Sequence, residues 1–452
     1  MKKSSSLLFA WFAVALQTNA QEVPSSPEWY DEAKFGIFIH WGVYSVPAFS
    51  MTEEIENPSH WSEKNQAYSE WYWHSITKKY SPTYDFHTKT YGSDFEYQDF
   101  APMFKAELFD PAYWADIFER SGAKYVVMVA KHHDGYALWP SKYSWNWNSM
   151  DVGPHRDLLG DLSREVKKRG LKMGVSYSLD AWFDPLYLKD FNSYVDEKLH
   201  PQLKELITDY EPDIFVAGGH NMHTVEAFKT DGFLKWLYSE SPVKNKIVVN
   251  DRWGKDSPKK LGSYFTTQYS DVNAPKNFDK KWEEMRGIGK SFGYSRIEKA
   301  DDYMSSAELI ETLVKVVCNG GNLLLNIGPT ADGRIPVIMQ ERLLEIGNWL
   351  SINGEAIYST RKWVNTEMNL SKLYQFYAKK NSDLYVIITE KYDDKIFVNG
   401  IESVKSVRLL GYTGEIEYSM VGKTIRISFP SLVAGKKVTN PAWVFKLESI
   451  VE

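Results

Sequence analysis

The sequence predicts an α/β fold in which a (β/α)8 barrel is followed by a C-terminal β-sandwich. From residue 35 to about residue 358, short runs rich in Val, Ile, Phe and Leu alternate with amphipathic helical stretches, which is typical of a parallel sheet with crossover helices. After residue 358 the helical periodicity stops and short alternating runs follow, which is typical of a sandwich. A chain of 452 residues with 43% hydrophobic content can fill cores of this size.

Each element is predicted from its hydrophobic pattern. Barrel strands are expected at 35–40, 124–129, 171–178, 213–217, 247–250 and 322–327. Helices are expected at 112–120 and 158–166 and around Leu199, Leu203 and Leu206, where apolar residues recur at helical spacing. Sandwich strands are expected at 374–378, 384–388, 396–398, 425–429 and 443–447. The predicted domains are therefore a barrel over residues 21–358 and a sandwich over residues 359–452.

Residues 1–20 have the pattern of a secretory signal peptide. Lys2 and Lys3 precede an apolar stretch at 7–16, and small residues follow where signal peptidase could cut before Gln21. The alternative is an N-terminal membrane anchor, but the stretch is too short to span a bilayer and no later segment is long enough. We expect a protein of the secretory pathway, secreted or lysosomal, with no membrane span.

Two single residues bear on compartment and modification. Cys318 is the only cysteine, which excludes an intrachain disulfide, and its apolar helical surroundings indicate an inert buried thiol. Asn369 begins an Asn-Leu-Ser sequon and is the predicted glycosylation site.

The balance of 53 basic and 59 acidic residues gives a net charge of −6, so the protein has no basic field that would attract nucleic acid or an anionic membrane.

Several classes of site are absent from the sequence. There is no Gly-rich phosphate loop, Cys-x-x-Cys pair, nucleophile elbow or His-Glu-x-x-His helix, which disfavours kinase, dinucleotide, serine-hydrolase and zinc-protease functions. Aromatic residues make up 15% of the chain, and flat aromatic rings suit pockets that stack on the apolar faces of sugars, although core packing explains most of them.

Most of the candidate site residues lie at the ends of predicted strands, at the end of a barrel where chemistry is found, and Glu70 and Trp71 lie in a Trp-rich segment at 70–73. His132 and His133 close one strand, and both could bind one polyol if a bulge turns them inward. The alternatives are one buried histidine beside a surface one, or a metal pair, for which no third ligand is spaced nearby. Further candidates combine hydroxyl-binding groups with stacking rings, and for each a structural role is the alternative: His40, Trp41, Glu70, Trp71, Tyr177 and Arg252.

The chain, including these candidate residues, resembles the α-L-fucosidase family, and especially its animal tissue type. The resemblance runs from about residue 28 to the C-terminus and is carried by strings at 38–47, 131–135, 144–149, 152–157, 249–254, 326–330 and 350–358. It implies a retaining glycosidase with a catalytic barrel and a C-terminal β-sandwich, no metal or organic cofactor, fucosylated glycans as partners, and assembly as a homo-oligomer. It also implies that the fucose pocket is lined by His40, Glu70, Trp71, His132, His133, Tyr177 and Arg252.

The chain departs from the family where the catalytic nucleophile is expected. The resemblance places the nucleophilic aspartate at the end of the strand at 213–217, and Gly218 occupies that position. A glycine has no side chain with which to form a glycosyl-enzyme. The family's tryptophan two residues earlier is Val216 here. A water held by His220, or by a carboxylate elsewhere in the site, could attack the sugar directly, which would convert retention into inversion.

The proton donor is left open by the sequence. A family Thr-x-Glu segment is matched by Thr-Thr-Gln here, so that Gln268 supplies an amide that cannot exchange protons. Glu283 matches another position proposed as acid/base in relatives, and Asp271 is a further alternative. A salt bridge is the structural explanation for Glu283. Two functions remain: hydrolysis of terminal α-L-fucose on glycoproteins and glycolipids, doubtful without the nucleophile, or a secreted, catalytically inactive fucose-binding protein.

Overall fold

The computed structural model describes residues 24–51, 68–79, 81–274, 276, 278–364, 374–390, 394–430 and 441–452. Its centre is a sheet of eight parallel strands. The strands are β1 (Phe35–Ile39), β2 (Tyr125–Lys131), β3 (Lys172–Ser178), β4 (Ile214–Gly218), β5 (Val248–Val249), β6 (Phe265–Gln268), β7 (Trp282–Gly287) and β8 (Asn322–Ile327). Most of their residues are buried on both faces, as parallel strands covered by helices require.

The sheet curls through the order β5-β4-β3-β2-β1-β8-β7-β6, so β1 pairs with both β2 and β8. Between β5 and β6 there is no ladder, and one backbone hydrogen bond from Ser263 N to Val249 O, 2.7 Å long, joins the segments there. The predicted barrel is confirmed, with a seam between β5 and β6. A shift in register at Val129/Lys131 marks an irregularity in β2 just before the two histidines.

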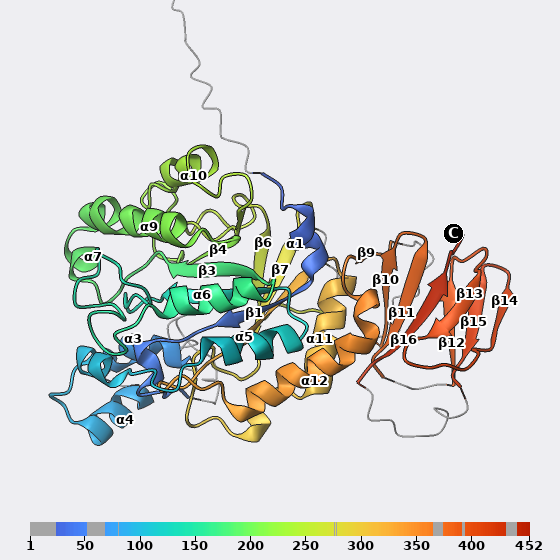
Figure 1. Cartoon of the computed structure of the whole chain (residues 1–452), viewed down its shortest axis with the longest axis horizontal. Helices are drawn as coiled ribbons and strands as arrows, with labels where there is room; N and C mark the ends of the chain where they lie inside the picture. The colour runs from blue at the N-terminus through green and yellow to red at the C-terminus, as the bar shows by residue number, and fades with distance from the viewer. Residues whose placement is uncertain are drawn as a thin grey trace, which may run out of the picture.

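Helices surround the sheet (Figure 1). They are α1 (Glu28–Ala33), α3 (Tyr72–Ile76), α4 (Pro82–Tyr91), α5 (Pro111–Arg120), α6 (Leu158–Lys168), α7 (Pro185–Lys189), α8 (Phe191–Ser193), α9 (His200–Tyr210), α10 (Thr230–Ser239), α11 (Ser306–Cys318) and α12 (Val337–Asn353). Short turns are η1 (Val43–Ser45), η3 (Ser69–Trp71), η4 (Tyr97–Met103), η6 (Ala300–Asp302) and η7 (Gly354–Ala356), and Tyr194–Leu199 (η5) is a π-helix.

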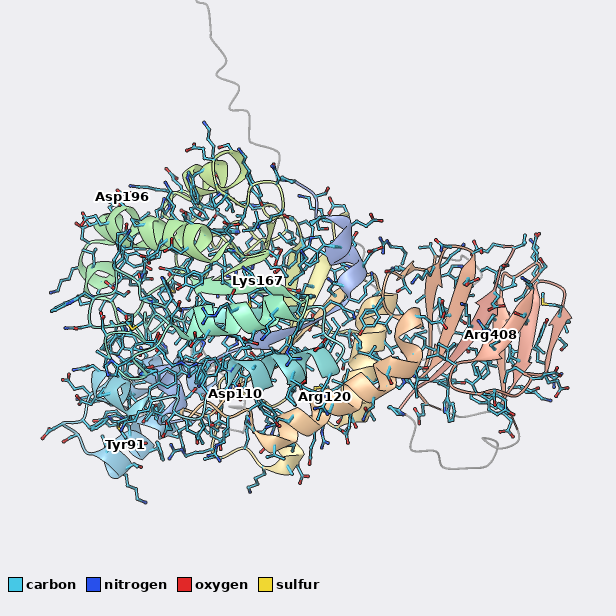
Figure 2. The ribbon with its side chains drawn as sticks, in the orientation of Figure 1. Tyr91, Asp110, Arg120, Lys167, Asp196 and Arg408 are labelled. Atoms are coloured by element: carbon cyan, nitrogen blue, oxygen red, sulfur yellow. The ribbon has the colours of Figure 1, made fainter. Side chains whose placement is uncertain are left out.

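Helix α5 shows how the sequence sets these elements. Asp110 accepts hydrogen bonds from the backbone N–H groups of Ala112 and Tyr113, and Pro111 occupies the first turn, where its missing N–H is no loss. Trp114 and Phe118 face the core, as predicted. Arg120 lies in the last turn, where the helix dipole favours a cation. Figure 2 shows Asp110 and Arg120 at opposite ends of this helix.

After η7 the chain forms antiparallel sheets. One sheet has the order β13-β16-β11-β10-β9 and the other β12-β15-β14, and buried apolar residues of both form one core cluster. The strands are β9 (Arg361–Lys362), β10 (Gln375–Lys380), β11 (Asp383–Ile388), β12 (Lys395–Asn399), β13 (Ser406–Leu409), β14 (Tyr418–Val421), β15 (Thr424–Ser428) and β16 (Trp443–Glu448). The two-sheet arrangement agrees with the predicted sandwich. Helices α11 and α12 lie between the barrel and these strands (Figure 1).

The predicted strands match the observed ones to within about two residues, but β6, β7, β9, β13 and β14 were not predicted. The predicted signal peptide at 1–20 and the sequon at Asn369 lie outside the described residues. Within the described part of the chain, no helix is both long and apolar enough to cross a membrane. Cys318 is buried and unpaired, and burial raises the pKa of its thiol to about 12, which agrees with an inert thiol.

Candidate active site

A cavity of about 230 Å³ lies at the carboxyl ends of the barrel strands. Every barrel strand except β8 contributes to its wall, either directly or through the residues that follow it. The lining comprises Phe38, His40, Tyr68, Glu70, Trp71, Val129, Lys131, His132, His133, Ser176, Ser178, Asp180, Trp182, Val216, Ala217, Gly218, Gly219, His220, Asn221, Met222, Arg252, Gln268, Met285 and Phe292. The position matches the rim where barrel enzymes carry their chemistry.

Three histidines form one side of the cavity. Nδ1 of His40 lies 2.6 Å from Oδ1 of Asn326, and the amide of Asn326 is oriented by donating to the carbonyl of Phe292. Nδ1 of His40 therefore carries the proton, which leaves Nε2 as an acceptor. Burial lowers the pKa of His40 to about 4. Burial also holds the pKa values of His132 and His133 well below their usual range, so all three rings are neutral at pH 7.

The histidines are held by specific contacts. Nδ1 of His133 lies 2.6 Å from the hydroxyl of Ser178, and its ring stacks on Trp182 with centroids 3.9 Å apart. Trp71 meets Trp182 edge to face at 4.5 Å. Nδ1 of His132 is buried without a hydrogen-bond partner in the described structure. The cavity thus offers neutral rings that can exchange hydrogen bonds with hydroxyl groups, next to aromatic faces that suit apolar C–H surfaces.

Two carboxyl groups line the cavity within the described structure, Glu70 and Asp180. Glu70 accepts a hydrogen bond from Gly293 N at 2.8 Å, but burial outweighs this and raises its pKa to about 7. Burial raises the pKa of Asp180 to about 7 as well, although the hydroxyl of Tyr187 donates to it at 2.8 Å. Each group can therefore hold a proton near neutral pH, which is what a general acid requires.

Strand β4 ends in open space. A Cβ built on Gly218 would have no heavy atom within 4 Å, so the missing side chain leaves room inside the cavity wall.

Arg252 follows β5, and its guanidinium donates to Oε1 of Gln268 at 2.9 Å, across the seam between β5 and β6. His220 also lines the cavity, and its Nδ1 is buried without a partner in the described structure. No described group of three or more His, Cys, Asp or Glu residues could hold a metal ion.

Comparisons with known proteins identify the family and the fold. The profile of the family described as Alpha-L-fucosidase matches residues 14–355. The chain belongs to the alpha-L-fucosidase family. An alpha-L-fucosidase of Dictyostelium discoideum is 42% identical over 96% of this chain and 94% of its own length. The human tissue alpha-L-fucosidase is 41% identical over 94% of this chain and 89% of its own length.

A solved structure of the same family is also similar. It is an alpha-L-fucosynthase of Thermotoga maritima with an Asp-to-Gly replacement, in complex with alpha-L-Fuc-(1-2)-beta-L-Fuc-N3. It superposes with a TM-score of 0.79 at 38% identity and covers 94% of this chain and 97% of that one. The resemblance seen in the sequence motifs is therefore confirmed for the family and for the fold.

Most of the residues predicted for the fucosidase pocket come together. The cavity lining includes His40, Glu70, Trp71, His132, His133 and Arg252, together with the position of Gly218. The irregularity in β2 allows both adjacent histidines to reach one cavity, which regular alternation along a strand would prevent. A single buried histidine beside a surface one does not describe this pair, because both rings line the cavity.

Four predicted residues lie outside the cavity lining. Trp41 is buried, and its indole donates to the carbonyl of Thr330 at 2.8 Å. The Tyr177 hydroxyl donates to Gln202 at 2.8 Å, although its ring supports Lys131, which does line the cavity. These two residues therefore contact core groups rather than the cavity space.

The two predicted acid/base candidates also lie elsewhere. Glu283 is buried, and its Oε2 accepts hydrogen bonds from the hydroxyls of Tyr30 at 2.7 Å and Tyr125 at 2.6 Å. Asp271 is exposed and accepts from Asn273 N at 2.9 Å. Neither carboxyl faces the cavity, and the salt bridge considered for Glu283 is replaced by tyrosine hydroxyls.

Sequence reasoning missed several lining residues of this fucosidase-family cavity. Asp180 and Trp182 were not predicted, although they follow β3 by two and four residues. Position just beyond a predicted barrel strand is the signal that could have found them. Lys131 belongs to the motif at 131–135 but was not predicted to line the pocket. Burial lowers its pKa to about 7.

Proposed function

We propose that this chain recognises terminal α-L-fucose on glycans in the cavity at the carboxyl end of the barrel and hydrolyses fucosides at most very slowly. The observation that carries the proposal is the pairing of several hydroxyl-binding groups with open space at Gly218. The family membership supports fucose as the sugar. Within the family, a catalytically inactive fucose-binding protein is thus favoured over an efficient fucosidase.

Recognition is supported by the chemistry of the lining. Fucose presents hydroxyl groups and an apolar face that includes its methyl group, and the cavity offers neutral imidazoles, a buried carboxyl and two tryptophan rings. Neutral imidazoles lose little solvation when they bind a neutral sugar. The fucosynthase of Thermotoga maritima holds a difucosyl azide despite its Asp-to-Gly replacement, which supports sugar binding without that aspartate on this fold.

Hydrolysis with retention requires a carboxylate that attacks the anomeric carbon and a second carboxyl about 5 to 5.5 Å away that donates a proton to the leaving oxygen. We place the first role at the position of Gly218, which has no side chain. In a different hydrolase, loss of the nucleophile reduced turnover by about 10⁶ while binding survived. Glu70 and Asp180, rather than Glu283, are the carboxyls we propose as proton donors, because they line the cavity and their pKa values are raised to about 7.

A second candidate function is slow hydrolysis with inversion. It is favoured by His220, which follows Gly218 by two residues and has an unpartnered Nδ1 in the cavity wall. A water in the open space could attack the anomeric carbon while His220 accepts its proton. Burial near Arg252 lowers the pKa of His220 to about 3, however, which makes it a weak base. We therefore rank this function second.

The decisive experiment restores the missing group. Gly218→Asp introduces a carboxylate at a position where the added Cβ meets no heavy atom within 4 Å. We expect the rate at which p-nitrophenol is released from p-nitrophenyl α-L-fucoside to rise by at least about 10³-fold over that of the wild-type chain. Gly218→Asn is the matched control, since it has the same shape but no nucleophilic oxygen, and it should stay at the wild-type rate.

Binding is measured separately by calorimetry with L-fucose on the wild-type chain and on Gly218→Asn. We expect saturable binding to both proteins. Trapping of a covalent adduct by a fluorinated fucosyl inactivator should occur only in Gly218→Asp. Turnover of the wild-type chain at ordinary enzymatic rates would contradict the inactivity, and absence of fucose binding would contradict the recognition. Inverted product from the wild-type chain, lost in His220→Phe, would favour the second candidate.

A further inference from the structure

A second cavity, of about 480 Å³, lies at the opposite end of the barrel from the fucose site. Its walls are formed by residues that come just before β1, β6, β7 and β8, together with β9 of the C-terminal sheet. The carboxyl ends of the same strands point away from it. In Figure 1, β9 lies on the side of the C-terminal strands that faces the barrel. The cavity therefore joins the amino-terminal end of the barrel to the C-terminal sheet.

The lining of this cavity is strongly cationic. Its described residues include six basic side chains and two acidic ones: Lys34, Lys276, Lys280, Lys281, Arg361 and Lys362 against Asp31 and Asp279. Three serines (Ser25, Ser26 and Ser263) add hydroxyl groups. An excess of positive charge in a concave wall raises the local concentration of anions.

Lys34 is the unusual member. Its exposed fraction is 1%, and its ammonium makes no ion pair in the described structure. Its side-chain hydrogen-bond neighbour is Lys281, which is itself nearly buried. Burial, followed by the charges of Lys281 and Arg361, lowers the pKa of Lys34 to about 6. Two neighbouring buried ammonium groups are unfavourable unless one loses its proton or an anion neutralises both.

The neighbouring groups compensate this charge only in part. The Lys281 ammonium donates to the carbonyl of Gly320 at 3.0 Å and lies 3.8 Å from a carboxylate oxygen of Asp31. The Arg361 guanidinium donates to the carbonyl of Thr360 at 3.0 Å. Two carboxylates, those of Asp31 and the buried Glu283, act on Lys281, and Asp31 also acts on Lys34. Cys318 also lies near Lys34, but burial raises the pKa of its thiol, so it supplies no negative charge.

We propose that this cavity is a binding site for a tetrahedral oxyanion of the phosphate or sulfate class, held by Lys34, Lys281 and Arg361. Such an anion accepts several hydrogen bonds at once, and its charge matches two ammonium groups and one guanidinium. The cavity is large enough for an ester of the anion with a sugar as well as for the free ion. Because Lys34 and Lys281 precede barrel strands and Arg361 belongs to β9, the bound anion links the two parts of the molecule.

The test compares sulfate with chloride at equal ionic strength. Sulfate does not titrate near neutral pH, so any protons taken up on binding are taken up by the protein. At pH 7 we expect the wild-type chain to take up close to one proton on binding, because Lys34 is mostly neutral without the anion and becomes charged with it. Calorimetry in two buffers with different ionisation enthalpies measures this uptake. We also expect Tm to rise by about 2 °C in 20 mM sulfate.

The matched variant is Lys34→Met, which keeps an unbranched side chain, shorter by one atom, and removes the buried ammonium. We expect it to fold and to lose both the proton uptake and the extra rise in Tm. Sulfate stabilises many proteins without binding them, so the difference between variants is the readout. Lys395→Met, which changes an exposed lysine of β12, should respond like the wild-type chain.

If Lys34→Met does not fold, Lys281→Met provides the same comparison. Equal Tm rises in the wild-type chain and in the folded variant, with no proton uptake by the wild-type chain, would overturn the proposal. Titrations with inorganic phosphate, a hexose monophosphate and a hexose monosulfate then identify the source of the anion. Tighter binding of an ester than of the free ions would assign the site to a phosphorylated or sulfated sugar. Because this cavity is separate from the fucose site, fucose binding by Lys34→Met should be unchanged.

Discussion

Gly218 and Gly219 are adjacent glycines with opposite tolerance for a side chain. A Cβ at Gly218 meets open space, whereas a Cβ at Gly219 would lie 2.5 Å from the Ser178 hydroxyl and 2.7 Å from the His133 ring. The φ angle of Gly219 is +61°, which a residue with a Cβ adopts only at a cost. The second glycine is therefore required by the fold of the cavity, and the first is not.

This contrast gives a prediction for alanine substitutions. Gly219→Ala should lower the free energy of unfolding by about 1–3 kcal/mol through strain and crowding. It should also weaken fucose binding, because the His133 ring must move. Gly218→Ala should change both quantities little. Chemical denaturation and fucose calorimetry on the two variants check the prediction, and equal effects at the two positions would contradict it.

Glu70 predicts a pH dependence of stability. Burial raises its pKa from 4.5 to about 7, so the folded protein keeps a proton that the unfolded chain releases above pH 4.5. The free energy of unfolding should therefore fall as pH rises from about 4.5 to 7, by on the order of 3 kcal/mol from this group. Glu70→Gln should remove that contribution. Denaturant unfolding of both proteins at pH 5 and pH 8 measures it, and parallel pH profiles would argue against the raised pKa.

At the level of elements, β6 and β7 show why the sequence was insufficient. Strand β7 carries Glu283 and Glu284, both fully buried, and β6 consists of Phe-Thr-Thr-Gln. Hydrophobic pattern cannot detect strands whose buried positions are polar. One oxygen of Glu283 is paired with residues distant in sequence, Tyr30 and Tyr125. Strands with continuous apolar runs, such as β2 and β8, were found for the opposite reason.

The tyrosine pair around Glu283 gives a prediction for β7. Tyr125→Phe removes a hydroxyl donor to the buried carboxylate of Glu283, whose other oxygen has no partner in the described structure. We expect a loss of about 1–3 kcal/mol in the free energy of unfolding. Fucose affinity should be unchanged, because Glu283 lies outside the cavity lining. Tyr385→Phe, which removes a hydroxyl from the half-exposed Glu355, is the control and should cost less. Weaker fucose binding by Tyr125→Phe would reconnect Glu283 with the site.

For the whole molecule, the barrel and the sandwich were predictable because each has a strong periodicity over a long stretch. Six pocket residues were also predicted. His40, His132, His133 and Arg252 lie in motifs that carry the family resemblance, at strand ends, whereas Glu70 and Trp71 lie in a Trp-rich segment. Trp41 and Tyr177 sit at strand ends too, but their side chains turn to Thr330 and Gln202, and nothing in the local sequence specifies that direction. The direction of a side chain at a strand end depends on tertiary packing, which one sequence does not reveal.

The seam between β5 and β6 leaves the barrel with two strand edges that share no ladder in the described structure. Amide protons along those edges should exchange with deuterium faster than those of β1, whose two neighbours protect it. Arg252 and Gln268 face each other across the seam through one hydrogen bond. A sugar bound by Arg252 would stabilise the contact between the two edges. Sugar binding in the cavity should therefore slow deuterium uptake in β5 and β6. Mass spectrometry could then report ligand binding by a protein that releases no product.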